Sequence, residues 1–283
     1  MQTVLITGAG GFVGRRAARY FEKRGTVLAP SHRELDITDE ESVRGFFRQY
    51  RPDAVLHCAA VSDVGRCQRE PERSWRINVE GSVHVAEAAR ETGAKCVLCS
   101  SDQVYFGSES ALPHREDETL SPANGYGRQK LAMERRCLEA DPDCVCLRLS
   151  WMYDPVKWEP GEKDTFFTRL LTALETGGAL TLSANDRRGL TDVNRVAENM
   201  ALAFSLPGGV YNFGSGNGFS TFDLVQRLLE ETGLGGKISL EQDPAGFPDQ
   251  PRNLTMDLRK LNGAGIFFPT TLESLKAGLR ARE

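Results

Sequence analysis

The chain has 283 residues, of which 40% are hydrophobic and 26% are charged, a composition typical of a globular protein. Its 35 basic and 39 acidic residues give a net charge of -4, which argues against a nucleic-acid partner, because nucleic-acid surfaces carry a basic excess. No apolar run approaches the roughly 20 residues of a membrane-spanning helix, so no membrane partner is expected either.

Apolar, strand-like runs alternate with helical patterns through the first half of the chain. In chain order, strands are predicted over 3–7, 26–30, 53–60, 95–101 and 144–151. Helices are predicted over 12–24, 39–49, 71–92 and 125–139, the second beginning at the cap candidate Thr38. Strands that are apolar along their whole length, with helices between them, indicate a parallel sheet covered on both faces. The predicted fold is α/β, a Rossmann-type doubly wound parallel sheet.

The pattern becomes less regular after Trp151, which predicts a smaller C-terminal substrate-binding lobe. The polar, proline-containing stretch 154–165 is predicted to be a flap over the substrate. Further elements are predicted over 166–178, 179–182, 209–215 and 219–233, the last capped by Ser220 or Thr221 and ended by Gly233. We predict a nucleotide-binding domain over 1–150 and a mainly substrate-binding lobe over 151–283. A strand and helix near 189–213 are predicted to return to the first domain.

Four glycines lie in TGAGGFVG, between the first predicted strand and the first predicted helix. Glycines there permit a tight turn and let a pyrophosphate approach the positive N-terminus of the helix. We therefore predict a dinucleotide site. Its predicted residues in this turn are Gly8, Gly11, Phe12, Val13 and Gly14.

The end of the second strand bears on which dinucleotide is bound. NAD-binding proteins usually carry an acid there, which bonds the adenosine ribose. This chain instead has Ser31, His32 and Arg33, and arginine offers a planar donor fork that suits a 2′-phosphate. NADP is the predicted cofactor, with NAD as the alternative. The pair Arg15-Arg16 begins a helix close to the adenosine phosphates; help to Arg33 is an alternative, but we expect the pair to be solvated.

A second constellation indicates redox chemistry. Ser101 follows the fourth strand, and Tyr126 and Lys130 lie one turn apart on the next helix. The lysine ammonium is expected to lower the pKa of the tyrosine, so that its hydroxyl exchanges a proton with a carbonyl. The serine hydroxyl is expected to hold the same oxygen, and the carboxyl ends of parallel strands bring such residues to one crevice. We predict an NAD(P)-dependent oxidoreductase.

The segments TGAGGFVG, HCAA, CSSDQVYFG, YGRQK and RLSWMYD, in this order, resemble the extended short-chain dehydrogenase/reductase superfamily. Nearly the whole chain is similar to the dTDP-4-dehydrorhamnose reductase family. The resemblance implies reduction of a nucleotide-activated 4-keto-deoxysugar, with Ser101, Tyr126 and Lys130 as the catalytic residues, and a homodimer.

The resemblance also implies further binding positions. On the cofactor side these are Asp36, Ile37, Ala59 and Ala60, together with Tyr126 and Lys130, and Asn78 supports the site. On the substrate side they are the stretch Val61–Val64, beginning at Val61, together with Asp102, Gln103 and Trp151. Arg187, from the pair Arg187-Arg188, is predicted to reach a nucleotide diphosphate.

Two departures from that family leave the sugar open: Gln103 stands where a tyrosine is usual, and Gly65 where an acid is frequent. An epimerase or dehydratase of a nucleotide sugar remains an alternative. Another is a cofactor-binding regulatory subunit, resembling that of methionine adenosyltransferase.

The seven cysteines stand in a chain with no recognisable secretory signal, so reduced thiols and a cytoplasmic location are expected. Cys96 and Cys99 lie three apart on a predicted strand and should face opposite sides of the sheet, so no metal site is predicted. His57 is predicted to be a hydrogen-bonded core residue.

Overall fold

The computed structural model describes residues 2–158, 162–248 and 251–280. Its centre is a six-stranded sheet in the order β10-β5-β4-β3-β1-β2, in which every neighbouring pair is parallel. The strands are β1 (Thr3–Thr7), β2 (Thr26–Leu28), β3 (Ala54–His57), β4 (Lys95–Ser101), β5 (Val145–Leu149) and β10 (Gly209–Phe213). The predicted Rossmann-type parallel sheet is confirmed.

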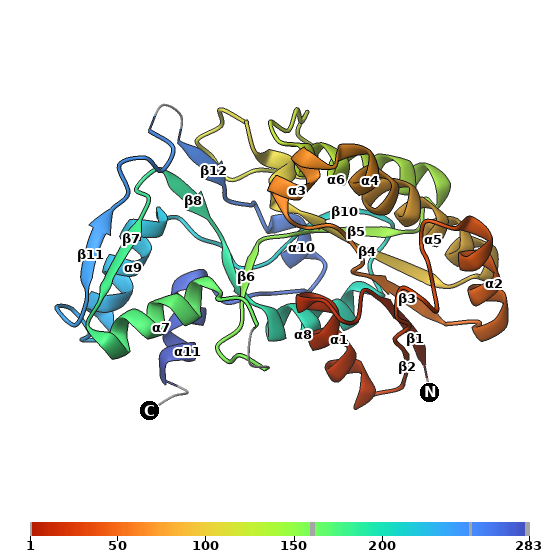
Figure 1. Cartoon of the computed structure of the whole chain (residues 1–283), viewed down its shortest axis with the longest axis horizontal. Coiled ribbons are helices and arrows are strands. Elements are labelled where there is room, and N and C mark those ends of the chain that lie inside the picture. Colours follow the sequence, from red (N-terminus) through yellow and green to blue (C-terminus); the bar gives the residue numbers. More distant parts are fainter. Residues whose placement is uncertain (1, 159–161, 249–250, 281–283) are drawn as a thin grey trace.

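Helices cover both faces of this sheet (Figure 1). One face packs against α1 (Phe12–Glu22) and α8 (Val193–Ala203). The other packs against α2 (Glu40–Tyr50), α5 (Gly81–Thr92) and α6 (Gly125–Ala140). Cys99 belongs to the first core and Cys96 to the second, which confirms that these two thiols face opposite sides.

The strand order reverses between β1 and β3. The chain moves from β1 to the edge strand β2, and then crosses back to build β3, β4, β5 and β10 on the other side. At such a reversal the connections after two adjacent strands diverge, which leaves a crevice at the carboxyl edge of the sheet. The glycine-rich turn after β1 and the segment after β3 both begin at this edge.

The predicted helix over 71–92 is continuous but changes its winding. It consists of α4 (Pro71–Trp75), the π-helical turn η1 (Arg76–Glu80) and α5. A π turn adds a residue to the helical path and often marks a functional position.

The expected cap at Thr38 is wrong: Asp39 caps α2 by accepting hydrogen bonds from the amides of Glu41 and Ser42. A carboxylate suits a helix N-terminus, because it meets the positive end of the dipole.

A smaller lobe with its own apolar core lies beside the sheet (Figure 1). Its strands pair two by two: β6 (Trp151–Tyr153) with β9 (Leu190–Asp192), β7 (Ala179–Leu182) with β11 (Ser239–Gln242), and β8 (Asp186–Arg188) with β12 (Arg252–Leu254). Its helices are α7 (Phe166–Thr176), α9 (Thr221–Glu231) and α11 (Thr271–Arg280). Ser220 caps α9, as predicted. Although α8 and β10 follow β9 of this lobe in the chain, β10 is a strand of the central sheet and α8 packs on one face of that sheet.

Short helices complete the described chain: α3 (Val64–Arg69), the 3-10 turn η2 (Asp102–Tyr105) and α10 (Arg259–Gly263). Among the described residues, no helix has the length and apolar character needed to cross a bilayer.

Candidate active site

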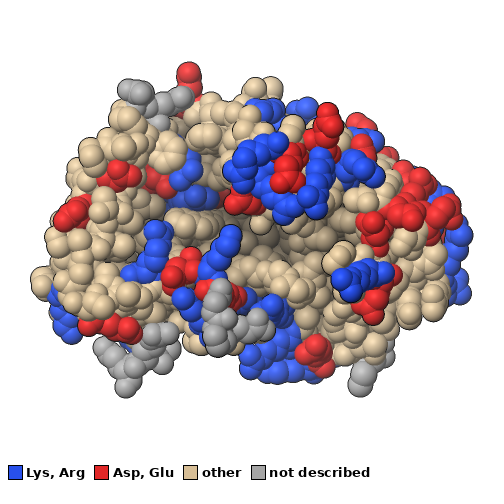
Figure 2. Space-filling model, viewed as in Figure 1, with Lys and Arg blue, Asp and Glu red and all other residues tan. Residues whose placement is uncertain are grey.

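A cavity of about 860 Å³ opens along the carboxyl edge of the sheet and extends to the smaller lobe. Figure 2 shows a hollow in this face of the molecule, with lysine and arginine side chains near its rim. The predicted residues that line the cavity are Gly8, Gly11, Phe12, Val13, Gly14, Ala60, Ser101, Asp102, Gln103, Tyr126, Lys130 and Trp151. Ser62 and Val64 of the predicted stretch 61–64 and Glu162 of the predicted flap also line it, whereas sequence reasoning missed Cys58, Cys99 and Arg252.

The glycine-rich turn is packed as a dinucleotide site requires. Gly8 has φ +66°, and a Cβ added there would lie 2.7 Å from the backbone of Ala59. A Cβ on Gly14 would lie 2.3 Å from the carbonyl oxygen of Gly8, so only glycine lets α1 begin so close to β1. No side chain caps α1 and no acid lies in its first turn, which leaves its positive N-terminus free for a phosphate. These residues fit a dinucleotide pyrophosphate.

The residues predicted to contact the adenosine end lie outside the cavity lining. Ser31, His32 and Arg33 are exposed beyond the end of β2, and the Ser31 amide donates to the Glu34 carboxylate at 2.7 Å. That hydrogen bond lowers the pKa of Glu34. The Asp36 carboxylate accepts from the amide and hydroxyl of Thr38, so it is engaged within its own turn.

Two of the predicted cofactor positions are packing residues. Ile37 is buried, and a Cβ on Gly81 would lie 2.9 Å from its side chain. The backbone of Ala59 packs against Gly8 of the glycine-rich turn and does not line the cavity, whereas Ala60 lines the cavity.

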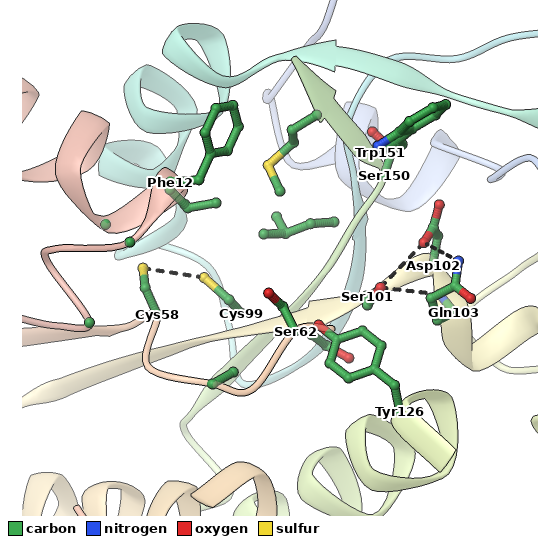
Figure 3. Close-up of a pocket in the computed structure, with 18 of the residues that line it drawn as sticks. Phe12, Cys58, Ser62, Cys99, Ser101, Asp102, Gln103, Tyr126, Ser150 and Trp151 are labelled. Carbon is green, nitrogen blue, oxygen red and sulfur yellow. Dashed lines mark hydrogen bonds between the residues drawn. The ribbon is translucent and has the colours of Figure 1, made fainter. Parts of the chain in front are cut away.

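The predicted catalytic residues Ser101, Tyr126 and Lys130 all line the cavity. Figure 3 shows Ser101 and Tyr126 at one wall of it. Ser101 ends β4, and Asn124 caps α6 through the amide of Gly127, which places Tyr126 and Lys130 on the first turns of the helix. A Cβ on Gly127 would lie 2.2 Å from the carbonyl oxygen of Gln103. Because α6 begins in contact with the end of β4, the phenol and the Ser101 hydroxyl approach each other.

The electrostatics of the tyrosine differ from the sequence expectation. Burial, followed by the nearby Asp102 carboxylate, raises the pKa of Tyr126, and the Ser101 hydroxyl only partly opposes this. The Lys130 ammonium donates to the Cys99 carbonyl at 2.7 Å and lies 5.8 Å from the phenol ring centroid, and in this position it does not offset the effect of burial on the tyrosine pKa. Burial in turn lowers the pKa of Lys130. The phenol is therefore held in its protonated form.

The substrate side contains an arginine one position away from the predicted one. Arg188 lines the cavity, donates to Asp102 at 3.0 Å and lies over the Trp151 ring at 4.8 Å from its centroid. Arg187 is exposed and does not line the cavity, because successive side chains of β8 point to opposite faces. Of the pair Arg187-Arg188, it is therefore Arg188 that lies at the cavity, and contact with a diphosphate stays a prediction.

Comparisons with known proteins place the chain in a family. The family model described as the RmlD substrate binding domain matches residues 1–281. The chain belongs to the RmlD substrate binding domain family. This confirms the resemblance predicted from the sequence motifs.

Relatives of this RmlD-family chain match along most of its length. The spore coat polysaccharide biosynthesis protein SpsK of Bacillus subtilis is 31% identical, over 100% of this chain and 98% of that protein. A dTDP-4-dehydrorhamnose reductase of Streptomyces griseus is 34% identical, over 74% of this chain and 69% of that protein. The solved structure of dTDP-4-dehydrorhamnose reductase from Bacillus anthracis in complex with NADP has a TM-score of 0.84, covers 99% of both chains and is 22% identical, which supports the fold.

In this RmlD-family site, Asn78 of the π-helical turn holds the segment after β3. Its side chain accepts from the Val61 amide at 2.7 Å and donates to the Val61 carbonyl at 3.0 Å and to Gln129 at 2.8 Å. Val61 itself does not line the cavity, although its neighbours Ala60 and Ser62 do.

His57 is buried between the hydroxyls of Thr7 and Ser82, and burial lowers its pKa to about 3. It is a hydrogen-bonded core residue, as predicted.

Arg16 is buried, so the expectation that it is solvated is wrong. It donates to Asp154 at 2.8 Å and to Glu162 at 2.5 Å, and its guanidinium lies between the rings of Phe12 and Trp158. These contacts fix the described ends of the predicted flap, 154–158 and 162–165, to α1 at the edge of the cavity. Residues 159–161 of that prediction lie outside the described residues, and its mobility stays a prediction.

Proposed function

We propose that this chain is an NADPH-dependent reductase of a nucleotide-activated 4-keto-deoxysugar, the type of reaction that its relatives named dTDP-4-dehydrorhamnose reductase carry out. The observation that carries the proposal is that Ser101, Tyr126 and Lys130 line the same cavity as the glycine-rich turn. A proton donor and a dinucleotide site in one cavity are what carbonyl reduction needs.

Each of the three proposed catalytic residues has a different role in the protonation of the carbonyl oxygen. When bound, the nicotinamide dinucleotide supplies the hydride for the carbonyl carbon. Tyr126, kept protonated by burial, donates its proton to the oxygen, and the Ser101 hydroxyl donates a hydrogen bond to the same atom. Lys130 donates one hydrogen bond to the Cys99 carbonyl, and this bond holds its ammonium beside the phenol. There the positive charge stabilises the phenolate that forms when Tyr126 gives up its proton.

The far end of the cavity supports a nucleotide-linked substrate. Arg188 and Arg252 both line it, and Arg252 makes a bidentate ion pair with Asp186 at 2.8 and 2.6 Å. The Nε of Arg188 is buried and has no hydrogen-bond partner among the described residues. A buried donor of this kind is stabilised by an anionic acceptor, and the diphosphate of a nucleotide sugar would supply one.

The experiment that tests the activity is NADPH oxidation against a panel of nucleotide-linked 4-keto-6-deoxysugars that differ in base and in sugar configuration. We expect stoichiometric NADPH consumption with at least one member. Conversion of a sugar without net NADPH oxidation would instead support the epimerase alternative. Binding of NADPH without conversion of any member would support the regulatory-subunit alternative.

A panel of several sugars is also needed because one residue beside the predicted catalytic residues departs from the family pattern. Gln103 replaces the usual tyrosine, and its side-chain oxygen accepts from Asn124 at 3.0 Å while its amide lies 3.4 Å from Asp102. An amide in this position presents both a donor and an acceptor, so we propose that the sugar hydroxyls selected here differ from those that a tyrosine selects.

We predict that Arg33→Ala weakens NADPH binding by roughly tenfold to hundredfold and leaves NADH binding nearly unchanged. The reason is the loss of a charged hydrogen bond to the 2′-phosphate, worth about 1.5–3 kcal/mol. Isothermal titration with both dinucleotides measures the effect. Arg48→Ala, which removes an exposed charge near the end of α2, is the matched control. Equal losses for NADPH and NADH would contradict the cofactor assignment.

We propose the homodimer and the cytoplasmic location from the resemblance to the family. Sedimentation of the purified chain tests the dimer, and a single monomeric species at micromolar concentration would refute it.

A further inference from the structure

Two cysteines lie side by side in the wall of the cavity (Figure 3). Cys58 follows β3 and Cys99 belongs to β4, and their Sγ atoms are 3.6 Å apart. The register pairs His57 with Leu98, so the next residues of the two parallel strands, Cys58 and Cys99, stand opposite each other. Both line the cavity, so a small reagent in the cavity has access to both.

Their placement fits a disulfide bond. Neighbouring strands lie roughly 4.7–4.9 Å apart, within the roughly 4.4–6.8 Å that Cα atoms of a disulfide span. The sulfurs must close from 3.6 Å to about 2.05 Å, which a side-chain rotation supplies without a change of strand register.

The two thiols are chemically unequal. The hydrogen bond between the two sulfurs, together with the Lys130 ammonium, lowers the pKa of Cys99, whereas that bond and burial raise the pKa of Cys58. The Lys130 ammonium is held in place by its bond to the Cys99 carbonyl. The thiolate is the nucleophile in sulfur chemistry, and Cys99 is the residue whose carbonyl holds the Lys130 ammonium, so Cys99 is assigned here as the attacking sulfur and Cys58 as the resolving one.

The other thiols serve as internal controls. Cys96, Cys137, Cys144 and Cys146 are buried in the core on the opposite face of the sheet. Cys67 is the buried residue of α3 and donates to the Val61 carbonyl. None of these five lines the cavity.

We propose that Cys58 and Cys99 form an oxidisable dithiol in the wall of the cavity, which peroxide converts to an intrachain disulfide and which bound dinucleotide shields. Cys99 attacks one peroxide oxygen, the O–O bond breaks, and a sulfenic acid forms at Cys99 as the first water leaves. Cys58 then attacks the Cys99 sulfur, the S–O bond breaks, and the S–S bond forms as the second water leaves. Overall, the two thiols lose two electrons and two protons, and hydrogen peroxide accepts them.

The test uses the reduced full-length chain treated with hydrogen peroxide and analysed by thiol titration and peptide mapping. We expect the loss of two titratable thiols, a Cys58–Cys99 linked peptide, and full recovery with dithiothreitol. In Cys58→Ser, Cys99 should stop at the sulfenic acid, detected with a dimedone probe, and Cys99→Ser should give neither product. Oxidation of a core cysteine first, or no linked peptide in the folded wild type, would overturn the dithiol.

The shielding is measured separately with NADP⁺ as the protecting ligand. At a concentration about 100-fold above its dissociation constant, the rate of disulfide formation should fall by about 100-fold, because only the free chain reacts. This arm rests on the proposed function. An unchanged rate despite measured NADP⁺ binding would refute the shielding, and no NADP⁺ binding would refute the proposed cofactor. Neither outcome alters the result of the first experiment.

Discussion

Tyr126→Phe should lower turnover by about 10²–10⁴-fold while changing dinucleotide affinity only a few-fold, because it removes a positioned acid and little else. The ring keeps its buried place at the start of α6, and the glycine-rich turn is untouched. The measurement is single-turnover NADPH oxidation with an active member of the sugar panel, beside a titration of NADPH binding. Near-normal turnover would refute the role of Tyr126 as proton donor.

Lys130→Met provides the companion measurement. It should lower turnover and also weaken dinucleotide binding, since the ammonium stabilises the phenolate and has donors left for the cofactor. The effects of the two substitutions on turnover should be non-additive, because both disable one proton transfer.

Turnover of the wild type should stay unchanged up to at least about pH 9, since burial raises the pKa of Tyr126 above the ordinary value of about 10 and so keeps the phenol protonated.

Arg188→Met should destabilise the fold by about 3 kcal/mol and raise the KM for the nucleotide sugar by roughly tenfold or more. Its partner Asp102 is 2% exposed, so removing the guanidinium leaves a buried carboxylate without its counter-charge. For a chain of this size the midpoint of thermal unfolding should fall by roughly 5–10 °C. Scanning calorimetry and steady-state kinetics measure the two effects.

Arg187→Met is the matched control, since it changes the neighbouring residue of the same strand to the same side chain. It should alter neither the unfolding midpoint nor KM, because Arg187 is exposed and points away from the cavity. Combining Asp102→Asn with Arg188→Met should restore much of the stability but not the KM, which separates the buried charge from substrate binding. A larger KM effect from Arg187→Met would show that the assignment to Arg188 is wrong.

The parallel sheet and the glycine-rich turn were predictable because their signals are local. Apolar strands followed directly by helices leave few alternatives to a parallel sheet, and the turn residues are contiguous. The Tyr126–Lys130 spacing follows from the helical period alone. Side-chain direction was less certain: Arg187 and Arg188 are adjacent, and only the register of β8 decides which one faces the cavity.

The fold class, the place of the glycine-rich turn and the candidate residues Ser101, Tyr126 and Lys130 could be inferred from the amino-acid sequence alone, because each depends on spacing within one or two elements. Other features arise only from the tertiary structure. It buried Arg16 between two acids far along the chain, and it raised the pKa of Tyr126 where the pattern predicted a lower one. It also brought Cys58 and Cys99, 41 positions apart, within 3.6 Å. Burial, charge pairing and strand register depend on which distant segments meet, and no local pattern encodes those meetings.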